Sequence, residues 1–160
     1  MYQHQTNSPV AGVLAPPPLL FLAAWLSAEA LHRRHPLPLR RGRRDTGRIA
    51  GAVAIGAGLL LSGVVMRRFH QAGTPVSPLH PTLRLVVDGP YRYTRNADYL
   101  GQLLIYCGAS VAANRAWPLL LLPPPLTLLR DGVVLREEAY LTRVLGPAYR
   151  AYAEKVPRWL

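Results

Sequence analysis

The sequence predicts an all-α membrane protein, a polytopic helical bundle of about four spans that includes a C-terminal helical hairpin. Long stretches of the 160-residue chain contain no charged side chain, and half of all residues are apolar. Charged residues make up 17% of the chain, against about 25% in an average soluble domain. The expected spans are residues 10–31, 48–66, 98–114 and 117–131.

Charge and composition exclude several other classes of protein. The chain has 19 basic and 8 acidic residues and a formal net charge of +11. A disordered basic tail would not contain this much Leu, Val and Ala. The single cysteine, Cys107, excludes a disulfide framework within the chain and a cysteine-rich zinc site. No metal site is expected, because His32 and His35 flank two arginines whose charge would repel a cation.

The sequence supports the second predicted span more strongly than the first. Between Arg48 and Arg67 lie 18 residues without charge, which as a helix nearly cover a hydrocarbon core of about 30 Å. Such a helix has no polar face for water, which disfavours the alternative of a soluble bundle. Its glycine-rich part, 51–58, indicates close helix packing rather than a phosphate cradle. Span 10–31 is interrupted by prolines at 16–18, so complete crossing is left open.

The third and fourth spans are shorter and form the predicted hairpin. Their charge-free runs have 16 and 14 residues, on either side of Arg115. Trp117 in the turn suits a membrane interface, where Arg115 can reach the headgroups. The prolines at 123–125 are expected to divide the last span into a short membrane half and a helix that leaves the bilayer.

Basic residues give the expected orientation. With four spans, the loop 67–97 and the C-terminal part share one side and carry eleven Arg and Lys, against eight on the other side. The positive-inside rule then weakly favours a cytoplasmic position for both, although the loop 32–48, with seven Arg, argues for the opposite. Anionic headgroups account for the basic excess. Nucleic-acid binding is not expected, because this Arg cluster lacks interleaved aromatic residues.

A polar segment, residues 74–101, joins the second and third spans. It is rich in Pro and Tyr. Asn96, with Thr94 as a rival, is expected to cap the third helix. The free N–H groups at such a helix start would face the loop and favour an anion. The alternative is a plain capped membrane helix with interfacial tyrosines.

A second polar segment, residues 126–160, carries two adjacent carboxylates. Apolar residues at helical spacing form two stripes, and Glu137 falls in one while Glu138 falls in the other. Burial of an unpaired carboxylate costs several kcal/mol. These side chains are therefore expected to have partners: arginines from residues 74–101, ligand amines or hydroxyls, or water. The alternative is a solvated helix face. Arg136 is adjacent but points away by about 100°.

Two motifs in these segments resemble a known superfamily. GPYRYTRNADYLG at 89–101 and REEAYLTRVLGPAYRAYAEKVPRWL at 136–160 are similar to the motifs of isoprenylcysteine carboxyl methyltransferases and phospholipid methyltransferases, integral membrane enzymes that use S-adenosylmethionine. TPVSP at 74–78 resembles the approach to the first motif. The resemblance implies a membrane methyltransferase core over 48–160, preceded by an N-terminal span and an Arg-rich loop over 1–47.

The resemblance also implies a cofactor-binding loop and helix on the cytoplasmic side. Arg95, Arg136 and Glu138 are the expected catalytic residues; the two arginines would hold the cofactor's carboxylate or an acidic acceptor group, or would pair with the carboxylates. Ala97 and Asp98 depart from the family pattern, which usually has Pro and then Met or Ser. The positions that match the cofactor shell are Leu85, Val86, Tyr91, Asn96, Tyr99 and Glu137.

The implied function is transfer of a methyl group from S-adenosylmethionine to a lipophilic acceptor, by O-methylation of a carboxylate or N-methylation of an amine. The acceptor would enter from the bilayer. The expected location is the inner membrane of a bacterium, with the active site facing the cytoplasm. Two alternatives stay open. A small transporter would need its carboxylates at mid-bilayer, and a catalytically inactive scaffold would keep the fold without binding the cofactor.

Overall fold

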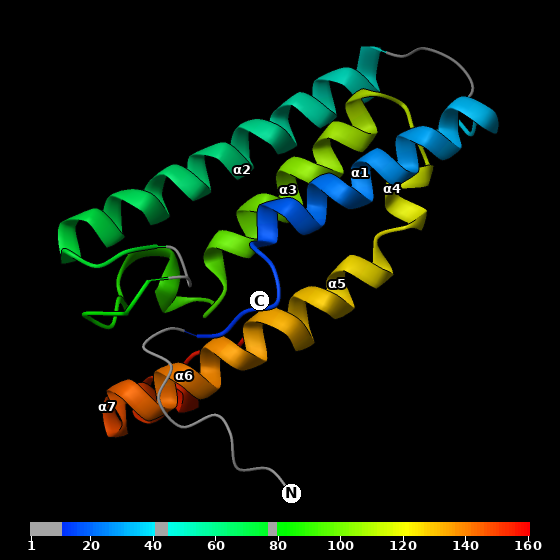
Figure 1. Cartoon of the computed structure of the whole chain (residues 1–160). Coiled ribbons are helices and arrows are strands. Elements are labelled where there is room, and N and C mark those ends of the chain that lie inside the picture. The colour runs from blue at the N-terminus through cyan, green and yellow to red at the C-terminus, as the bar shows by residue number, and fades with distance from the viewer. Residues whose placement is uncertain (1–10, 41–44, 77–79) are drawn as a thin grey trace, which may run out of the picture.

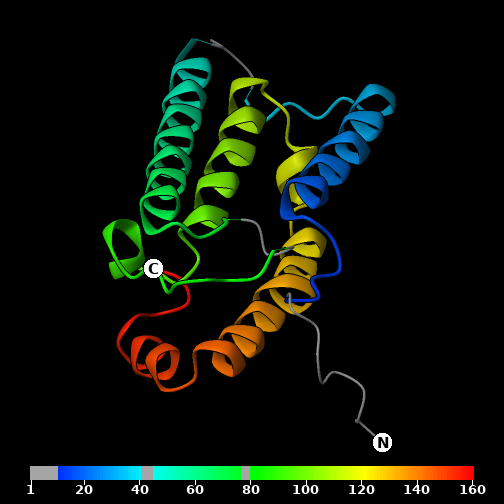
Figure 2. The same ribbon diagram turned by 60° about the vertical axis from the view of Figure 1, so that its left-hand side comes forward.

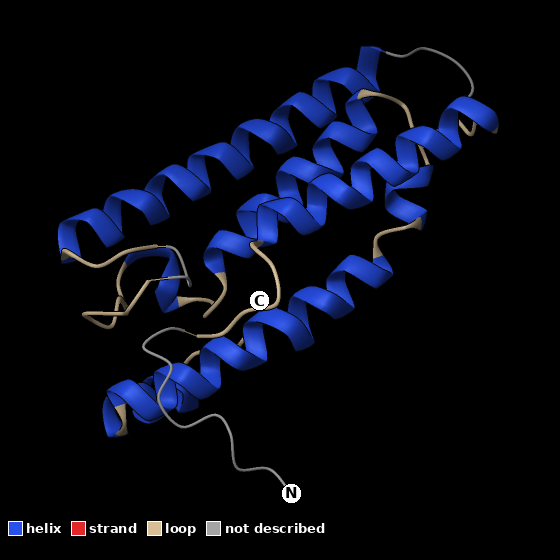
Figure 3. Cartoon of the chain, viewed as in Figure 1, coloured by secondary structure: helices blue, strands red, loops and turns tan. Residues whose placement is uncertain are grey.

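The structure is a computed structural model that describes residues 11–40, 45–76 and 80–160, and every regular element in these ranges is a helix (Figure 3). The all-α prediction is therefore confirmed. Ser77 and Pro78 of the TPVSP motif, Val10, and Arg41, Arg43 and Arg44 of the first loop lie outside these ranges. The elements are α1 (Pro17–Arg34), α2 (Asp45–Ala72), the 3-10 turn η1 (Gly89–Arg92), α3 (Ala97–Ala112), α4 (Trp117–Leu120), α5 (Pro123–Leu129), the π-helical turn η2 (Arg130–Val134), α6 (Leu135–Leu145) and α7 (Pro147–Lys155).

Two groups of helices make up the molecule. Helices α2 and α3 lie side by side along most of their length, and α1 packs against α3, α4 and α5 (Figure 1). Helices α5 and α6 continue into one another through η2 and form a single rod. Figure 2 shows that α7 turns back from the end of this rod and that the C-terminus returns to the region of η1.

Glycines allow the close approach of α2 and α3. A Cβ atom added at Gly51 would lie 2.5 Å from the carbonyl oxygen of Gly108, and one added at Gly58 would lie 2.6 Å from that of Gly101. The two backbones can approach this closely only because the glycines have no side chain, as in the small-residue interfaces of membrane helices. The prediction that residues 51–58 serve helix packing is confirmed.

Prolines begin helices here and do not kink them. The first helix starts at Pro17, so the prediction of a span from residue 10 is wrong over 11–16, which are not helical. Proline suits the first helical position because the N–H it lacks has no partner there. The second triplet begins α5 at Pro123, after α4 has ended at Leu120. The helical run is thus interrupted between Leu120 and Pro123, as predicted for this triplet. The expected short membrane half and the exit of the following helix from the bilayer stay predictions.

The hairpin turn after α3 is tied to the end of α1. The indole Nε1 of Trp117 donates to the carbonyl oxygen of His35 at 2.7 Å. The backbone N–H of Ala116 donates to the carbonyl oxygen of Leu37 at 3.0 Å. Glu29 of α1 forms an ion pair with Arg115 of the turn. These contacts hold α1 against the hairpin at the end of the molecule remote from η1.

Within the described residues, α2 alone is long and apolar enough to cross a membrane. Only 17% of its most apolar window is buried inside the protein, whereas the core helix of a soluble protein would be mostly buried. Its outward face exposes Val53, Leu59 and Leu60, which are 67%, 59% and 70% exposed. Helix α1 contains Glu29, Arg33 and Arg34, and α3 has 16 residues. The four-span arrangement stays a prediction.

Two buried clusters support the end of the molecule where η1 lies. One contains Tyr99 and Tyr106 of α3 together with Val133 and Val134 of η2. The other contains Val65 of α2, with Tyr91 and Ala97 as its further buried members. Tyr91 and Tyr99 are thus each fixed in a core cluster, which makes their positions rigid.

Candidate active site

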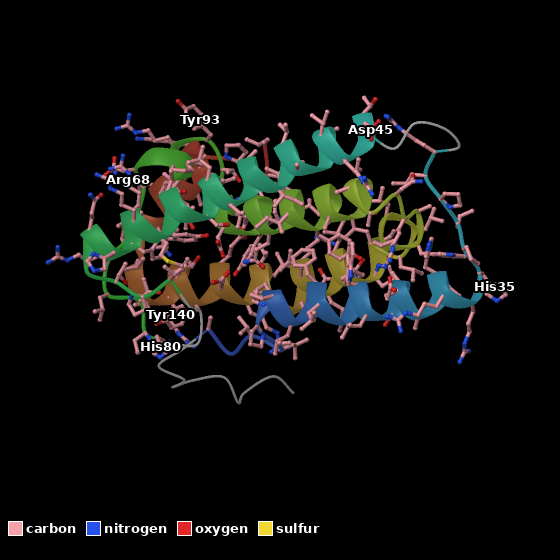
Figure 4. The ribbon with its side chains drawn as sticks, turned by 90° about the horizontal axis from the view of Figure 1, so that it is seen from above. His35, Asp45, Arg68, His80, Tyr93 and Tyr140 are labelled. Carbon is pink, nitrogen blue, oxygen red and sulfur yellow. The ribbon has the colours of Figure 1, made fainter. Side chains whose placement is uncertain are left out.

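A cavity lies at this end, between η1, the start of α3, α6 and α7. It contains about 870 Å³ of empty space, a volume that includes open solvent. Phe69 near the end of α2 also lines it, as do residues of the following loop, among them Thr82, Arg84, Leu85 and Val86. In Figure 4 the cavity residue Tyr140 lies at the opposite end of the molecule from His35 and Asp45.

Glu137 has no positively charged partner among the described residues, a condition that it shares with Asp98 in the same cavity. The hydroxyl of Tyr99 donates to its Oε2 at 2.6 Å. Burial raises the pKa of Glu137 from 4.5 to about 7, since the charged form loses hydration, and the carboxylates of Asp98 and Glu138 act in the same direction. A positively charged ligand would stabilise the ionised form of this carboxylate.

Glu138, the next residue, has its charge fully compensated. Arg95 donates from Nη1 to Oε1 at 2.9 Å. Arg158 donates from Nε to Oε1 and from Nη2 to Oε2, both at 2.8 Å. The Glu138 side chain is 17% exposed and that of Arg95 is 14% exposed. Two arginines thus hold this carboxylate, and the charge-assisted pair with Arg158 is bidentate.

The start of α3 is held by backbone carbonyls rather than by a side-chain capping hydrogen bond. Asn96 occupies the N-cap position, but its side chain makes no capping hydrogen bond. Its Nδ2 donates to the carbonyl oxygen of Arg158 at 2.9 Å. The hydroxyl of Thr94 donates to the same oxygen at 2.9 Å and accepts from the N–H of Asn96 at 3.2 Å. The prediction of Asn96 as the N-cap residue, with Ala97 as the first helical residue and Asp98 in the first turn, is confirmed. The Asn96 side chain binds the C-terminal segment and makes no capping hydrogen bond.

Tyrosines line much of the remaining wall. Tyr91 packs edge-on against Phe69, with ring centroids 5.6 Å apart. The hydroxyl of Tyr152 donates to the carbonyl oxygen of Tyr91 at 2.8 Å, and burial raises the pKa of Tyr152 to about 12. Tyr149 also lines the cavity. At neutral pH these residues are uncharged rings that can contact a cation.

The loop before η1 adds an apolar wall. Leu85 and Val86 line the cavity. The backbone N–H of Thr82 donates to the hydroxyl of Tyr140 at 3.1 Å, and that of Leu83 donates to Oγ1 of Thr74 at 3.0 Å. The first hydrogen bond ties the loop to α6, and the second ties it to the segment that follows α2.

Eight of the nine residues expected from the sequence line this one cavity; Arg136 does not. Arg136 donates from Nη1 to the carbonyl oxygen of Gly12 at 3.0 Å, on another side of α6. The eight are Leu85, Val86, Tyr91, Arg95, Asn96, Tyr99, Glu137 and Glu138.

Sequence reasoning did not single out several residues of the site. Arg84, Tyr149 and Tyr152 line the cavity, and Arg158 binds Glu138 from behind it. Asp98 lines the cavity as well, and its Oδ2 accepts from Nε2 of Gln102 at 2.8 Å. The tyrosines and Arg158 lie within the second motif, so their signal was present, although their positions depend on how α7 folds back.

The arrangement suits a ligand with both charges at one end and an apolar or aromatic part. Glu137 can accept a cation, and the rings and aliphatic side chains can contact a flat group. Arg95 keeps a buried donor, Nε, without a hydrogen-bond partner in the described part of the chain. That donor can bind a carboxylate close to the cation.

A family model described as phospholipid methyltransferase matches residues 46–148, well over half of the chain, and this range includes all nine expected site residues. No curated protein and no solved structure matches the chain.

Proposed function

Because the chain belongs to the phospholipid methyltransferase family, part of the isoprenylcysteine carboxyl methyltransferase-like superfamily, we propose that it transfers a methyl group from S-adenosylmethionine to a lipophilic acceptor. The family consists of methyltransferases. The observation that carries the proposal for this chain is Glu137, a partly buried carboxylate in a cavity, with a tyrosine donor and no cationic partner among the described residues.

The cavity residues fit S-adenosylmethionine. Its ammonium and sulfonium groups are positive, and Glu137 and Asp98 are cavity carboxylates that lack a counter-charge among the described residues. Its carboxylate matches the unpartnered Nε of Arg95. Tyr91 and Tyr99 would contact the cofactor beside these charges. Asn96, whose Nδ2 is already bound, would offer its Oδ1 as an acceptor, and Leu85 and Val86 would pack against the adenine ring.

The cofactor supplies an activated methyl group, so the protein's task is positioning and exclusion of water. The acceptor atom must lie in line with the methyl group at about 3–3.5 Å. A carboxylate acceptor needs no base, whereas an amine must first lose a proton. The fixed loop 82–86 and the rings of Tyr91 and Tyr152 would shield the site from water. Glu138 acts in this proposal through Arg95, which it holds at 2.9 Å.

We also propose a membrane setting for this core. Residues 48–160 would form the methyltransferase core, and residues 1–47 an N-terminal span with a basic loop. The exposed apolar face of α2 supports contact with lipid. In the four-span arrangement the cavity lies on the cytoplasmic side of a bacterial inner membrane, with anionic headgroups beside the basic loops, and the acceptor enters from the bilayer.

Titration of the detergent-purified protein with S-adenosylmethionine by calorimetry tests the proposal. The wild type is expected to bind. Glu137→Gln should bind about 10- to 100-fold more weakly, because a hydrogen-bonded charge is lost. Glu154→Gln, which removes an exposed acid on α7, is the matched control and should bind as the wild type does. A wild type that does not bind S-adenosylmethionine would contradict the proposal and favour the inactive scaffold.

A labelled methyl donor then identifies the acceptor class. The purified protein would be incubated with lipids that carry a free carboxylate and, separately, with lipids that carry a primary amine. Label in either class supports methyl transfer and names the acceptor chemistry. A protein that binds the donor but labels neither class, nor other lipids of the host membrane, would contradict catalysis.

A further inference from the structure

The C-terminal residues Pro157–Trp159, here called the clasp, join the two halves of the cavity. The carbonyl oxygen of Pro157 accepts from the backbone N–H of Arg95 at 3.0 Å. The carbonyl oxygen of Arg158 accepts from Thr94 and from Asn96, each at 2.9 Å. The backbone of the clasp therefore holds three consecutive residues directly before α3.

The side chains of the clasp bind the opposite half. The guanidinium of Arg158 binds both oxygens of Glu138 on α6, and the pair raises the pKa of Arg158. Trp159 packs against the core cluster that contains Tyr99 and Val134. Arg158 is 32% exposed and Glu138 is 17% exposed, so the pair is partly shielded from water and geometrically fixed.

We propose that the clasp is a positioning device for the methyl donor, in which Arg158 sets both the Asn96 turn and the Glu138–Arg95 pair. The inference rests on the proposed function of the cavity. Arg158 lies outside the residues that the family model matches, and it does not line the cavity. It acts through other residues and is a positioning residue, not a catalytic one.

Charge compensation gives this role a measurable consequence. The titratable and charged groups that line the cavity with Glu137 are Arg84, Tyr91, Arg95, Asp98, Tyr99, Glu138, Tyr140, Tyr149 and Tyr152, and Arg158 lies behind Glu138. The negative charge of Glu138 disfavours ionisation of Glu137. Loss of Arg158 leaves that charge less compensated, so the pH above which the donor binds should rise. A residue with a purely structural role would weaken binding without moving this midpoint.

Hydrogen exchange of the ligand-free protein is the first test. Arg158→Gln is expected to increase the exchange rate of the amides of residues 94–100, while those of α2 are unchanged. Arg150→Gln, a change at an exposed arginine of α7, is the control and should leave residues 94–100 as in the wild type. Equal protection of these amides in wild type and Arg158→Gln would overturn the proposal, whether or not the protein binds S-adenosylmethionine.

Calorimetric titration with S-adenosylmethionine across pH is the second test. Arg158→Gln should weaken binding about 10- to 100-fold, the effect expected when hydrogen bonds to a charged group are lost, and should raise the pH midpoint of binding. Arg158→Lys keeps the charge without the bidentate geometry, so its midpoint should lie near that of the wild type. If wild type and Arg158→Gln bind with the same affinity and midpoint, the clasp has no positioning role. A wild type that does not bind would refute the proposed function, while the exchange test still decides the clasp.

Discussion

Glu137 and Glu138 are neighbours on α6, but their surroundings differ in charge. Glu138 accepts three hydrogen bonds from two guanidinium groups, whereas Glu137 accepts one from a neutral tyrosine hydroxyl. The two arginines compensate the negative charge of Glu138, so this carboxylate stabilises the contact between α6, the turn before α3 and the C-terminal segment. Glu137 keeps the cost of its desolvated charge until a cation binds. The difference follows from their 100° separation around the helix.

The cost of ionising Glu137 predicts a stability change. The pKa of Glu137 rises from 4.5 in the unfolded chain to about 7 in the folded protein. The contribution of protonated Glu137 to the free energy of unfolding is therefore complete below pH 4.5, and it is lost as the pH rises through 7 and the carboxyl group ionises. At pH 8, Glu137→Gln should raise the unfolding free energy of the ligand-free protein by up to about 3 kcal/mol. A thermal midpoint in detergent that is lower than the wild-type midpoint at pH 8 would contradict this expectation.

At the residue scale, the sequence predicted which side chains would meet but not how they would pair. Helical spacing placed both carboxylates on the apolar face, and the motifs placed Tyr99 and Asn96 near them. The partner of Glu138 could not be predicted, because Arg158 lies 20 residues further along the chain. Its position depends on the reversal at Gly146, where φ is +55°. Arg136 lies outside the cavity because it points in a different direction around the helix, as its position next to Glu137 in the sequence predicted.

At the scale of the elements, the α2–α3 pair is the part of the fold with the closest packing. Gly58 and Gly51 of α2 face Gly101 and Gly108 of α3, and the backbones touch where these residues meet. Contact of this kind replaces the missing hydrophobic effect between helices in lipid. The cavity depends on it, because α2 and α3 carry Phe69 and Tyr99 into the wall.

Substitution at Gly58 should therefore destabilise the pair. Gly58→Leu places atoms where a Cβ alone would lie 2.6 Å from a backbone oxygen, and overpacking of this kind costs about 1–3 kcal/mol or more. The matched control is Gly63→Leu, at a position with no atom within 4 Å of an added Cβ. The thermal midpoint in detergent should fall for the first variant only; an equal fall for both would contradict the packing.

The sequence predicted helix positions better than helix boundaries. The charge-free run between Arg48 and Arg67 is the centre of α2, but the helix extends to Asp45 and Ala72, since charged residues also form helix. Hydrophobicity could not locate the helix start at Pro17, because residues 10–16 are as apolar as the helix that follows them. The π-helical turn at Arg130–Val134 has no sequence signal that we can identify.

At the scale of the whole molecule, the two ends have separate tasks. One end carries the cavity and the clasp. The other joins α1 to the hairpin turn through Glu29, which pairs with Arg115 and, at 3.0 Å, with Arg33. The Glu29 side chain is 18% exposed, and that of Arg33 is 78% exposed. The Arg115 side chain is 30% exposed, so its pair with Glu29 is better shielded from water than the pair with Arg33.

This division predicts a separation of stability from binding. Arg115→Gln leaves the Glu29 carboxylate without its shielded partner, so it should lower the thermal midpoint of the protein. It should not change the affinity for S-adenosylmethionine, because the hairpin turn contributes no residue to the cavity wall. Arg33→Gln, at the exposed partner, is the control and should change neither quantity. A weaker affinity in Arg115→Gln at a temperature where the protein is folded would show that the two ends are coupled.

The central claim for the whole molecule is that an uncompensated carboxylate in its cavity binds a positively charged methyl donor. The most direct measurement is the dissociation constant of S-adenosylmethionine as a function of pH, for wild type and Glu137→Gln. Between about pH 5 and pH 7, where the ammonium group of the donor keeps its proton, wild-type binding should strengthen with rising pH by up to about tenfold per pH unit, as the pKa of Glu137 near 7 requires. The Gln variant should bind more weakly and lack this dependence. Equal affinities with the same pH profile in both proteins would contradict the account.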